Sequence, residues 1–291
     1  MCRVRAETVT AYPLRTEGMT GLPSDRPSAE RARDLRPLFE PRSVAVLGAS
    51  DDPRKWGHWI AADALRGEHR RDVFLVNRRG GTVLGRPAYR RLVDLPHRPE
   101  LVVVAVPAAG FERAVDDALD AGAAAIVAIS AGLGELSDDG RARERAVVER
   151  VRAAGAVLLG PNCLGVFDAT AGLDLGCGGF PAGAIGLVSQ SGNLALEIAR
   201  LAADAGLGIS RFASLGNQAD LETHELLPSL AGHEPTRVIA VYCEDFRDGR
   251  AFARAAAAAV RAGTPVILLA AGASTAGARA ALSHTGALVS S

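Results

Sequence analysis

Short apolar runs and amphipathic stretches alternate along the chain from about residue 37. The apolar runs are rich in Val, Ile and Leu and have the length of strands that are buried on both faces. They are Ser43–Leu47, Val73–Val76, Leu101–Val106, Ala124–Ile129, Val157–Leu159, Ile185–Val188, Gly208–Ala213, Arg237–Cys243 and Pro265–Ala270. The stretches of helical length are Phe111–Ala121, Gly140–Ala154, Asn193–Ala205, Thr223–Ala231 and Gly249–Ala262. This alternation predicts parallel sheets covered by helices on both sides, with right-handed crossovers.

The alternation pauses between about residues 160 and 184. Gly160-Pro161-Asn162-Cys163-Leu164-Gly165 and a Gly-rich stretch from Gly172 to Gly186 occupy this segment, which is typical of turns. We therefore expect two α/β domains in tandem, in line with roughly 150 residues per domain for a chain of 291 residues. Before residue 37, Pro, Ser, Arg and acidic residues follow no apolar periodicity, so residues 1–36 are predicted to form a loose tail.

Charge and cysteine content exclude several classes of protein. The 33 Lys and Arg residues balance 33 Asp and Glu residues without a basic block, which argues against nucleic-acid binding. No stretch reaches the roughly 18 apolar residues that a membrane span needs, and the start lacks the apolar core of a secretory signal. The four cysteines form no C-x-x-C pair, which is typical of reduced thiols in a cytoplasmic protein. We interpret Cys163 and Cys243 as small buried apolar residues.

The turn after the first predicted strand has the chemistry of a phosphate-binding loop. Gly48-Ala49-Ser50 ends the strand, and a helix follows the segment from Asp51 to Gly57. Gly lets backbone approach a ligand closely, and the N–H groups at a helix start attract anions. Lys55, the single Lys beside 32 Arg residues, falls in this turn and offers a compact positive charge. The alternative is a plain connection in which Ser50 or Asp51 caps the helix.

Ligands of open α/β sheets bind beyond the carboxyl ends of the strands. In the first domain, the other ends carry Val76-Asn77, Val106-Pro107 and Ser130-Ala131-Gly132. The G-x-G-x-x-G fingerprint is absent from the sequence, and Asn77 stands where a NAD-binding domain carries an acidic residue. The pattern weakens a nicotinamide-dependent oxidoreductase and favours another nucleotide-like ligand with phosphates.

The strand ends of the second domain bring together a different set of groups. They carry Ser189–Gly192, Leu215–Gln218, Glu244-Asp245 and, further along the chain, Ser283–Gly286. Ser191 and Gly192 begin a helix whose N–H groups can bind a phosphoryl group, and a Ser N-cap without a ligand is the alternative. His284 can act as a nucleophile if a carboxylate such as Glu244 fixes its tautomer, whereas a surface position is the alternative. The other five His, at 58, 69, 97, 224 and 233, are interpreted as surface residues.

Six short segments of the sequence together carry a resemblance to a known family, in which they follow one another in the same order. They are Pro41–Ser50, Ala105–Pro107, Ile129–Gly132, Gly160–Gly165, Val188–Gly192 and Ser283–Leu288. In these segments the chain, from about residue 37 to 288, resembles the α-type half of the nucleoside-diphosphate-forming acyl-CoA synthetases. It is similar to the ADP-forming acetate–CoA ligases and to the succinyl-CoA synthetase α subunit.

The resemblance implies a fold, a reaction and a set of site residues. A CoA-binding Rossmann-like domain would span 37–162, and a flavodoxin-like parallel α/β domain with a phosphohistidine would span 163–291. The family makes an acyl-CoA thioester from a carboxylic acid, CoA and ATP, and the phosphoryl group passes through a His. By matching motif, His284 would be phosphorylated, Glu244 would orient it, and Ser191, Gly192 and Asn217 would bind phosphate. The CoA site would comprise Gly48, Ala49, Ser50, Lys55, Val76, Asn77, Pro107, Ser130 and Asn162.

The sequence departs from this family in charge and in length. Ala270 and Ala273 stand where the family has a Lys and an Arg, which removes positive charge expected near a phosphohistidine. The chain ends at Ser291, seven residues after His284, so the last helix and strand of the flavodoxin-like domain are expected to be missing. An ATP-grasp domain does not fit this length. ATP or ADP and Mg²⁺ are therefore expected to bind an ATP-grasp β-type partner.

Two functions are consistent with these observations. In the first, the chain is the cytoplasmic α-type subunit of an acyl-CoA ligase, part of an oligomer with the β-type partner. In the second, it is a non-catalytic or regulatory CoA-binding protein of the same family, and His284 is idle. Phosphorylation of His284 distinguishes the two.

Overall fold

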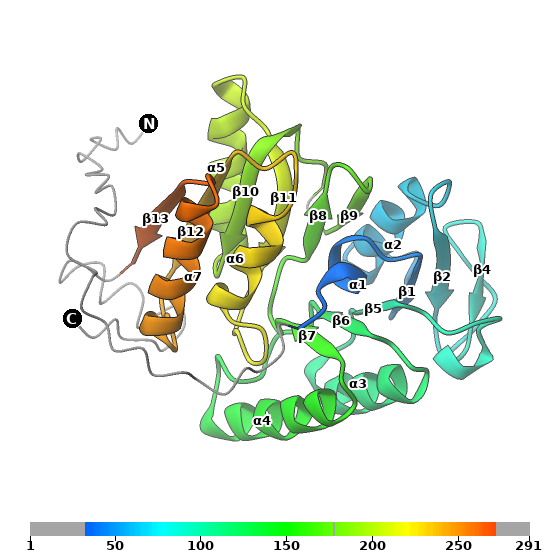
Figure 1. Ribbon diagram of the computed structural model, residues 1–291. Coiled ribbons are helices and arrows are strands. Elements are labelled where there is room, and N and C mark those ends of the chain that lie inside the picture. The colour runs from blue at the N-terminus through cyan, green and yellow to red at the C-terminus, as the bar shows by residue number, and fades with distance from the viewer. Residues whose placement is uncertain (1–32, 177, 272–291) are drawn as a thin grey trace, which may run out of the picture. The chain divides into compact units, whose positions relative to one another are not determined.

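The computed structural model describes residues 33–176 and 178–271, whose elements form two sheets with flanking helices (Figure 1). The first part of the chain holds α1 (Arg36–Phe39), β1 (Ser43–Leu47), α2 (Trp56–Arg66), β2 (Asp72–Val76), β3 (Thr82–Val83), β4 (Arg86–Tyr89), β5 (Leu101–Val104), α3 (Phe111–Asp120), β6 (Ala125–Ala128), α4 (Asp138–Ala153) and β7 (Val157–Leu159). The second part holds β8 (Val166–Asp168), β9 (Leu173–Leu175), β10 (Ala182–Ser189), α5 (Gly192–Asp204), β11 (Ile209–Ser214), α6 (Thr223–Ala231), β12 (Val238–Cys243), α7 (Gly249–Arg261) and β13 (Val266–Ala270). His284, Ala273 and most of the predicted tail lie outside the described residues.

The first sheet has the strand order β3-β4-β2-β1-β5-β6-β7, and all its pairings except that of β3 are parallel. From β1 the chain proceeds to β2 on one side and returns to β5 on the other. Leu47 at the end of β1 consequently lies beside Val76 of β2 and Val104 of β5. A reversal of strand order opens a crevice at the carboxyl ends, which is the usual binding position in doubly wound folds.

The second sheet has the order β13-β12-β10-β11-β8-β9 and is mixed. Strands β10 to β13 are parallel, as predicted, whereas β8 runs antiparallel to both β11 and β9. The segment between 160 and 184, which was expected to be rich in turns, thus also contains the short strands β8 and β9 and the first residues of β10. Strands β8 and β9 have three residues each, too few to produce a hydrophobic periodicity. The predicted fold class, two α/β domains with predominantly parallel sheets, is confirmed.

Successive residues of the first sheet face two different cores, as the pleat of a strand requires. Ala45 belongs to a cluster that α3 and α4 cover, and these helices lie together on one face of the sheet (Figure 1). Val44 and Val46 belong to a second cluster, which includes residues of α1 and α2. This second cluster continues through Val188 and Val241 to α6 and α7, so the two sheets share a core. On the other face of the second sheet, α5 packs over a separate small core.

None of the helices between residues 33 and 271 combines the length and apolar character that crossing a membrane demands.

Candidate functional site

Two glycines allow α2 to begin directly against the turn that ends β1. Gly48 has a φ of 100°, and a Cβ at this position would lie 2.3 Å from the carbonyl oxygen of Ala105. A Cβ on Gly57, in the first turn of α2, would lie 2.0 Å from the carbonyl oxygen of Gly48. Larger residues would force these backbones apart. The end of β1 is thus held close to the end of β5.

Asn77 fastens the end of β2 to the same turn. Its Nδ2 donates to the carbonyl oxygen of Ala49 over 2.7 Å. The carbonyl oxygen of Val76 accepts from the N–H groups of Gly48 and Ala49 at 3.0 and 3.2 Å. Ser50 Oγ accepts a backbone N–H two residues later at 3.1 Å, so it stabilises the turn locally. The structure brings together the predicted residues Gly48, Ala49, Ser50, Val76 and Asn77.

The predicted residues of the following strands adjoin one another at this edge. Ser130 Oγ donates over 2.7 Å to the carbonyl oxygen of Val106, directly before Pro107. The N–H of Asn162 donates to the carbonyl oxygen of Ser130 over 2.8 Å. Asn162 has a φ of 56°, a conformation that Asn tolerates better than most residues, in the turn between β7 and β8.

Asn217 connects this edge to the second domain. Its Oδ1 accepts from Asn162 Nδ2 at 3.1 Å, and its N–H donates to the carbonyl oxygen of Pro161 over 2.9 Å. Its Nδ2 donates to Glu135 Oε2 and Glu144 Oε1 at 2.6 and 2.7 Å. A residue predicted for the CoA site and one predicted for the phosphate site are therefore hydrogen-bonded to each other.

Sequence reasoning missed Glu135 and Glu144. Burial raises the pKa of Glu144 against the opposing hydrogen bonds from Asn217 and the N–H of Gly134. Burial acts in the same direction on Glu135, but hydrogen bonds from Asn217 and nearby N–H groups hold its pKa below the ordinary value. A signal was present for Glu144, because its place in α4 falls on the stripe of buried residues that includes Val147 and Val151.

The strand ends of the second domain converge on the side chain of Gln190. Its Oε1 accepts from the N–H groups of Glu244 and Asp245, and its Nε2 donates over 3.1 Å to the carbonyl oxygen of Asp245. Gln218 Nε2 donates to that same oxygen, also over 3.1 Å. Three of the predicted segments thus meet, while the segment that carries His284 lies outside the described residues.

The start of α5 adjoins this convergence. Ser191 Oγ accepts from the N–H of Leu194 at 3.4 Å, so Ser191 is the N-cap, and Gly192 is the first helical residue. Glu244 is 2% exposed and accepts a hydrogen bond from the Tyr242 hydroxyl at 2.9 Å. Ala270 ends β13 beside Cys243, directly before Glu244, so the position at which the resemblance leads us to expect a Lys lies in this part of the site.

Comparisons with known proteins agree with this arrangement. A CoA binding domain matches residues 42–169, and a succinyl-CoA ligase like flavodoxin domain matches residues 182–291. The alpha subunit of ADP-forming acetate–CoA ligase II from Pyrococcus furiosus is 35% identical over 255 residues, which cover 87% of this chain and 55% of that one. The chain therefore joins a CoA binding domain to a succinyl-CoA ligase like flavodoxin domain. The alpha subunit of ligase I from the same organism is also 35% identical, over 88% of this chain and 57% of its own length.

A solved structure of an acetyl-coenzyme A synthetase has the same fold over most of this chain. The dinucleotide-forming acetyl-coenzyme A synthetase 1 of Ca. Korarchaeum cryptofilum, in complex with phosphate and ADP, superimposes with a TM-score of 0.83 at 32% identity. The match covers 89% of this chain and 56% of that one. The chain thus spans a little over half the length of these synthetases.

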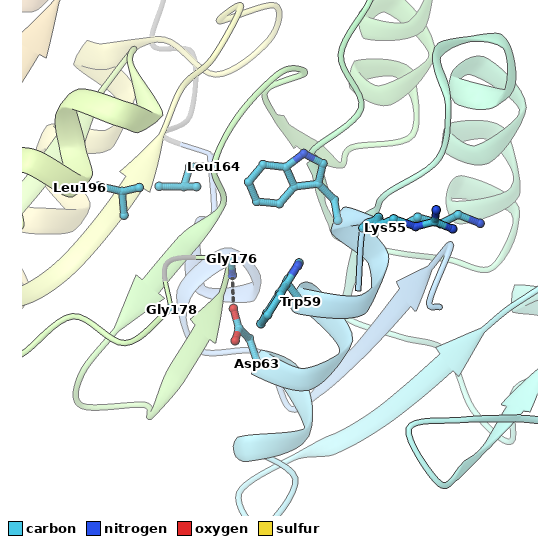
Figure 2. Close-up of a pocket in the computed structure, with 9 residues that line it drawn as sticks. Lys55, Trp59, Asp63, Leu164, Gly176, Gly178 and Leu196 are labelled. Atoms are coloured by element: carbon cyan, nitrogen blue, oxygen red, sulfur yellow. Dashed lines mark hydrogen bonds between the residues drawn. The ribbon is translucent and has the colours of Figure 1, made fainter. Parts of the chain in front are cut away.

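A cavity of about 530 Å³ lies between α2 and the start of α5 (Figure 2). Trp56 and Trp59, 55% and 53% exposed, line it together with Lys55, Leu164 and Leu196. A Cβ on Gly192 would lie 3.0 Å from the Cβ of Leu164, so the cavity adjoins the start of α5. In Figure 2, Leu164 and Leu196 approach from one side and Lys55 and Trp59 from the other.

Two further sequence interpretations can be compared with the structure. Burial raises the pKa of both Cys163 and Cys243 to about 12, so these thiols are protonated at neutral pH, as expected of buried apolar residues. The surface interpretation of His233 is wrong, because this residue is 9% exposed. Its Nδ1 and Nε2 lie 3.0 and 3.2 Å from the hydroxyls of Thr236 and Thr170, which explains how a His is accommodated there.

Proposed function

We propose that this chain is the α-type part of an NDP-forming acyl-CoA synthetase, which makes an acyl-CoA thioester from a carboxylic acid, CoA and ATP. ATP phosphorylates His284 and leaves as ADP. The phosphoryl group then moves to the carboxylate, giving an acyl phosphate and regenerating His284. The thiol of CoA attacks the acyl carbon, loses its proton and displaces inorganic phosphate.

The hydrogen bond between Asn162 and Asn217 carries this proposal. It joins the carboxyl edge of the first sheet to a strand end of the second, so one ligand can reach from the turn after β1 to the start of α5. The CoA site comprises Gly48, Ala49, Ser50, Lys55, Val76, Asn77, Pro107, Ser130 and Asn162. The cavity beside Leu164 receives the thiol end of CoA with the acyl group.

The second domain supplies the phosphoryl-transfer groups. Ser191 and Gly192 present the N-terminal end of α5 to the phosphoryl group, where N–H groups and the helix dipole compensate its charge. Glu244 orients His284 for transfer. Asn217 has its side-chain amide in hydrogen bonds to Asn162, Glu135 and Glu144, so it acts on phosphate by holding the loop after β11 in place.

The nucleotide and its metal bind elsewhere in the assembly. The relatives from Pyrococcus furiosus are named alpha subunits. We therefore assign ATP, ADP and Mg²⁺ to an ATP-grasp β-type partner in a cytoplasmic oligomer. In this assembly the CoA-binding domain spans 37–162, and the flavodoxin-like domain spans 163–291.

Labelling of His284 tests the proposal. The chain is incubated with its β-type partner and ATP labelled at the γ-phosphate, or with labelled acetyl phosphate alone, and the protein is assayed for acid-labile label. We expect label on the wild type, none on His284→Ala, and wild-type label on His69→Ala, because His69 is exposed and outside the site.

CoA binding, measured by calorimetry, separates the two candidate functions. A wild-type chain that binds CoA but takes up no label would contradict the ligase and favour the non-catalytic CoA-binding protein. Label that persists in His284→Ala would place the phosphoryl group on another residue and refute the mechanism.

A further inference from the structure

Arg71 is a buried cation with hydrogen-bonding capacity to spare. It precedes β2 at the amino edge of the first sheet and is 8% exposed. Its Nη2 donates to the carbonyl oxygen of Ala171, in the turn between β8 and β9. Within residues 33–176 and 178–271, no acceptor is in reach of its Nε or Nη1, although both atoms are buried. Buried donors almost always have partners, so these two indicate a missing acceptor.

A cavity of about 560 Å³ lies at this position and is lined by both domains. Arg42, Arg70 and Arg71 come from the first domain, whereas Thr170 and His233 come from the second. Arg70 Nη1 donates to the carbonyl oxygen of Thr170 over 2.9 Å. The walls of the cavity therefore already contact each other across the domain junction.

The charge around the cavity is predominantly positive. Glu40 is the acidic residue in its lining, and it pairs with Arg211 over 2.6 Å. Arg211 also pairs with the fully buried Asp168 over 2.6 Å, so this carboxylate is compensated as well. Arg42 pairs with Glu100 at the surface. Among the cavity's described cations, Arg70 and Arg71 have no ion pair within 4.0 Å.

Burial and the neighbouring charge of Arg70 lower the pKa of Arg71, and the carboxylate of Asp168, which acts in the opposite direction, only partly offsets them. A buried charge is costly unless an opposite charge compensates it. Water could satisfy the N–H groups of Arg71 but not its charge. An oxyanion satisfies both, and the guanidinium group matches phosphate oxygens in shape.

We infer that this cavity is a second ligand site, which binds a phosphate-type oxyanion through Arg71 and Arg70. The site is separate from the carboxyl edge, because β1 and β2 place Ser43 beside Asp72 at one end and Leu47 beside Val76 at the other. Strands of this length span roughly 16 Å. The cavity is larger than inorganic phosphate, so it also admits the phosphate group of a small phosphomonoester. The bound anion links the two domains, because residues of both line the cavity.

Thermal unfolding with and without phosphate tests the site. The wild type is expected to gain several degrees in Tm when inorganic phosphate is raised to about 100 times its Kd, with chloride keeping the ionic strength constant. Arg71→Met removes the charge while retaining an unbranched side chain of similar length. Phosphate that binds at the start of α5 stabilises both proteins, so the difference between their shifts reports on this cavity.

Arg71→Met is expected to lose most of the phosphate-dependent shift, and calorimetry is expected to show one phosphate fewer per chain than in the wild type. Arg71→Lys, which keeps the charge, should retain part of the shift and guards against a variant that simply folds poorly. Arg113→Met on α3, where Arg113 is 87% exposed, is the matched control and should behave like the wild type. Equal shifts in wild type and Arg71→Met would overturn the inference, whatever the outcome of His284 labelling.

Glycerol 3-phosphate and acetate distinguish the sources of the oxyanion. A shift with glycerol 3-phosphate that exceeds the shift with inorganic phosphate and depends on Arg71 identifies a phosphomonoester as the ligand. Equal Arg71-dependent shifts with both identify the free phosphate group as sufficient. An acetate shift as large as that of phosphate contradicts the assignment to a phosphate-type anion.

Discussion

The two ends of the domain junction differ in how they compensate buried charge. At the carboxyl end, Glu135 and Glu144 accept hydrogen bonds from Asn217 and from backbone N–H groups of the neighbouring loop. At the amino end, Arg71 donates to the carbonyl oxygen of Ala171, but the described chain offers its other two nitrogens no acceptor. The carboxylates are satisfied by groups that the fold supplies, whereas the guanidinium needs oxygen atoms from outside.

This difference has a chemical origin. Loops before helices expose several N–H groups in one direction, and a carboxylate can accept from them at once. A guanidinium directs its donors outward in a fixed plane and needs acceptors on several sides. Carbonyl groups near a sheet are mostly used by the neighbouring strands. A buried carboxylate whose hydrogen bonds are all made within the protein therefore indicates a structural role. A buried arginine with unused donors indicates a ligand-binding role.

Removal of the Asp220 carboxylate is expected to have the largest effect on stability, because this buried group is hydrogen-bonded only by parts of the fold itself. Its side chain is fully buried and accepts from Arg33 Nη2 at 2.6 Å, from Arg152 Nε at 2.8 Å and from the N–H of Leu158 at 2.9 Å. Asp220→Ala leaves the buried N–H of Leu158 and the partly buried guanidinium of Arg33 without their acceptor, whereas the Arg152 side chain is 57% exposed and can be solvated. We expect the free energy of unfolding in urea to fall by about 2–3 kcal/mol.

Asp204→Ala is the matched control for Asp220→Ala. Asp204 lies at the end of α5, is 63% exposed and pairs with Arg200 over 2.7 Å. Exposed ion pairs of this kind contribute little, so the expected change is below about 0.5 kcal/mol. Similar losses of unfolding free energy for the two variants would show that the buried carboxylate at the junction does not stabilise the fold more than an exposed one does.

Lys55 and Arg71 can be compared as ligand-binding residues, because each end of the junction has a cation beside a cavity. Lys55 lies beside the cavity at the carboxyl end and Arg71 beside the cavity at the amino end. Lys55→Ala is expected to weaken CoA binding about tenfold, since a charge-assisted contact to phosphate is lost. The phosphate-dependent shift in Tm that Arg71 provides should remain.

Arg71→Met should show the reverse pattern, with CoA affinity unchanged and the phosphate-dependent shift lost. Calorimetric titration of CoA into both variants and into Arg113→Ala checks this independence. A Lys55→Ala variant with the CoA affinity of the wild type would remove Lys55 from the CoA site and leave the carboxyl end without its ligand-binding cation.

Most elements were predictable because strand and helix patterns differ strongly in this chain. The limits of β1, β7 and α6 coincide with the predicted Ser43–Leu47, Val157–Leu159 and Thr223–Ala231. These segments are either apolar on both faces or amphipathic at helical spacing. The hairpin of β8 and β9 was not predictable, because its pairing with β11 is a tertiary contact between short segments of the chain.

The features of the candidate sites likewise divide into those that the sequence predicted and those that it did not. The meeting of Gln190, Gln218 and Glu244 followed from a rule of topology, since the parallel strands of one sheet end at a common edge. The hydrogen bond between Asn162 and Asn217 joins two different sheets, so this rule did not predict it. Glu144 occupies a place in α4 that the pattern reserves for apolar residues, and its partner Asn217 comes from the other domain. Arg71 stands in the polar run Arg70-Arg71-Asp72, which indicates a surface position. The turn between β8 and β9 buries it, and no local pattern could reveal that contact.

Glu144→Gln tests the smallest expected effect, which concerns the two carboxylates at the carboxyl end. The pKa of Glu144 is raised, whereas that of Glu135 is lowered. Both hydrogen bonds to Glu144, from Asn217 and from the N–H of Gly134, reach Oε1, which Gln retains. The substitution therefore removes only a buried charge beside Glu135, and we expect a gain on the order of 1 kcal/mol in unfolding free energy at pH 7. Glu149→Gln, on the exposed side of α4, should change stability by less.

The stability gained in Glu144→Gln is expected to depend on pH, and the raised pKa of Glu144 determines the direction of this dependence. Because burial raises the pKa of Glu144 above its ordinary 4.5, the folded protein holds this proton more tightly than the unfolded chain does. Its contribution to stability is complete below about pH 4.5 and is lost as the pH rises through the raised folded value. Glu144→Gln should therefore match the wild type in acid and exceed it progressively above pH 4.5. Parallel urea-unfolding profiles across this range would mean that the charge of Glu144 is compensated as fully as that of Glu135.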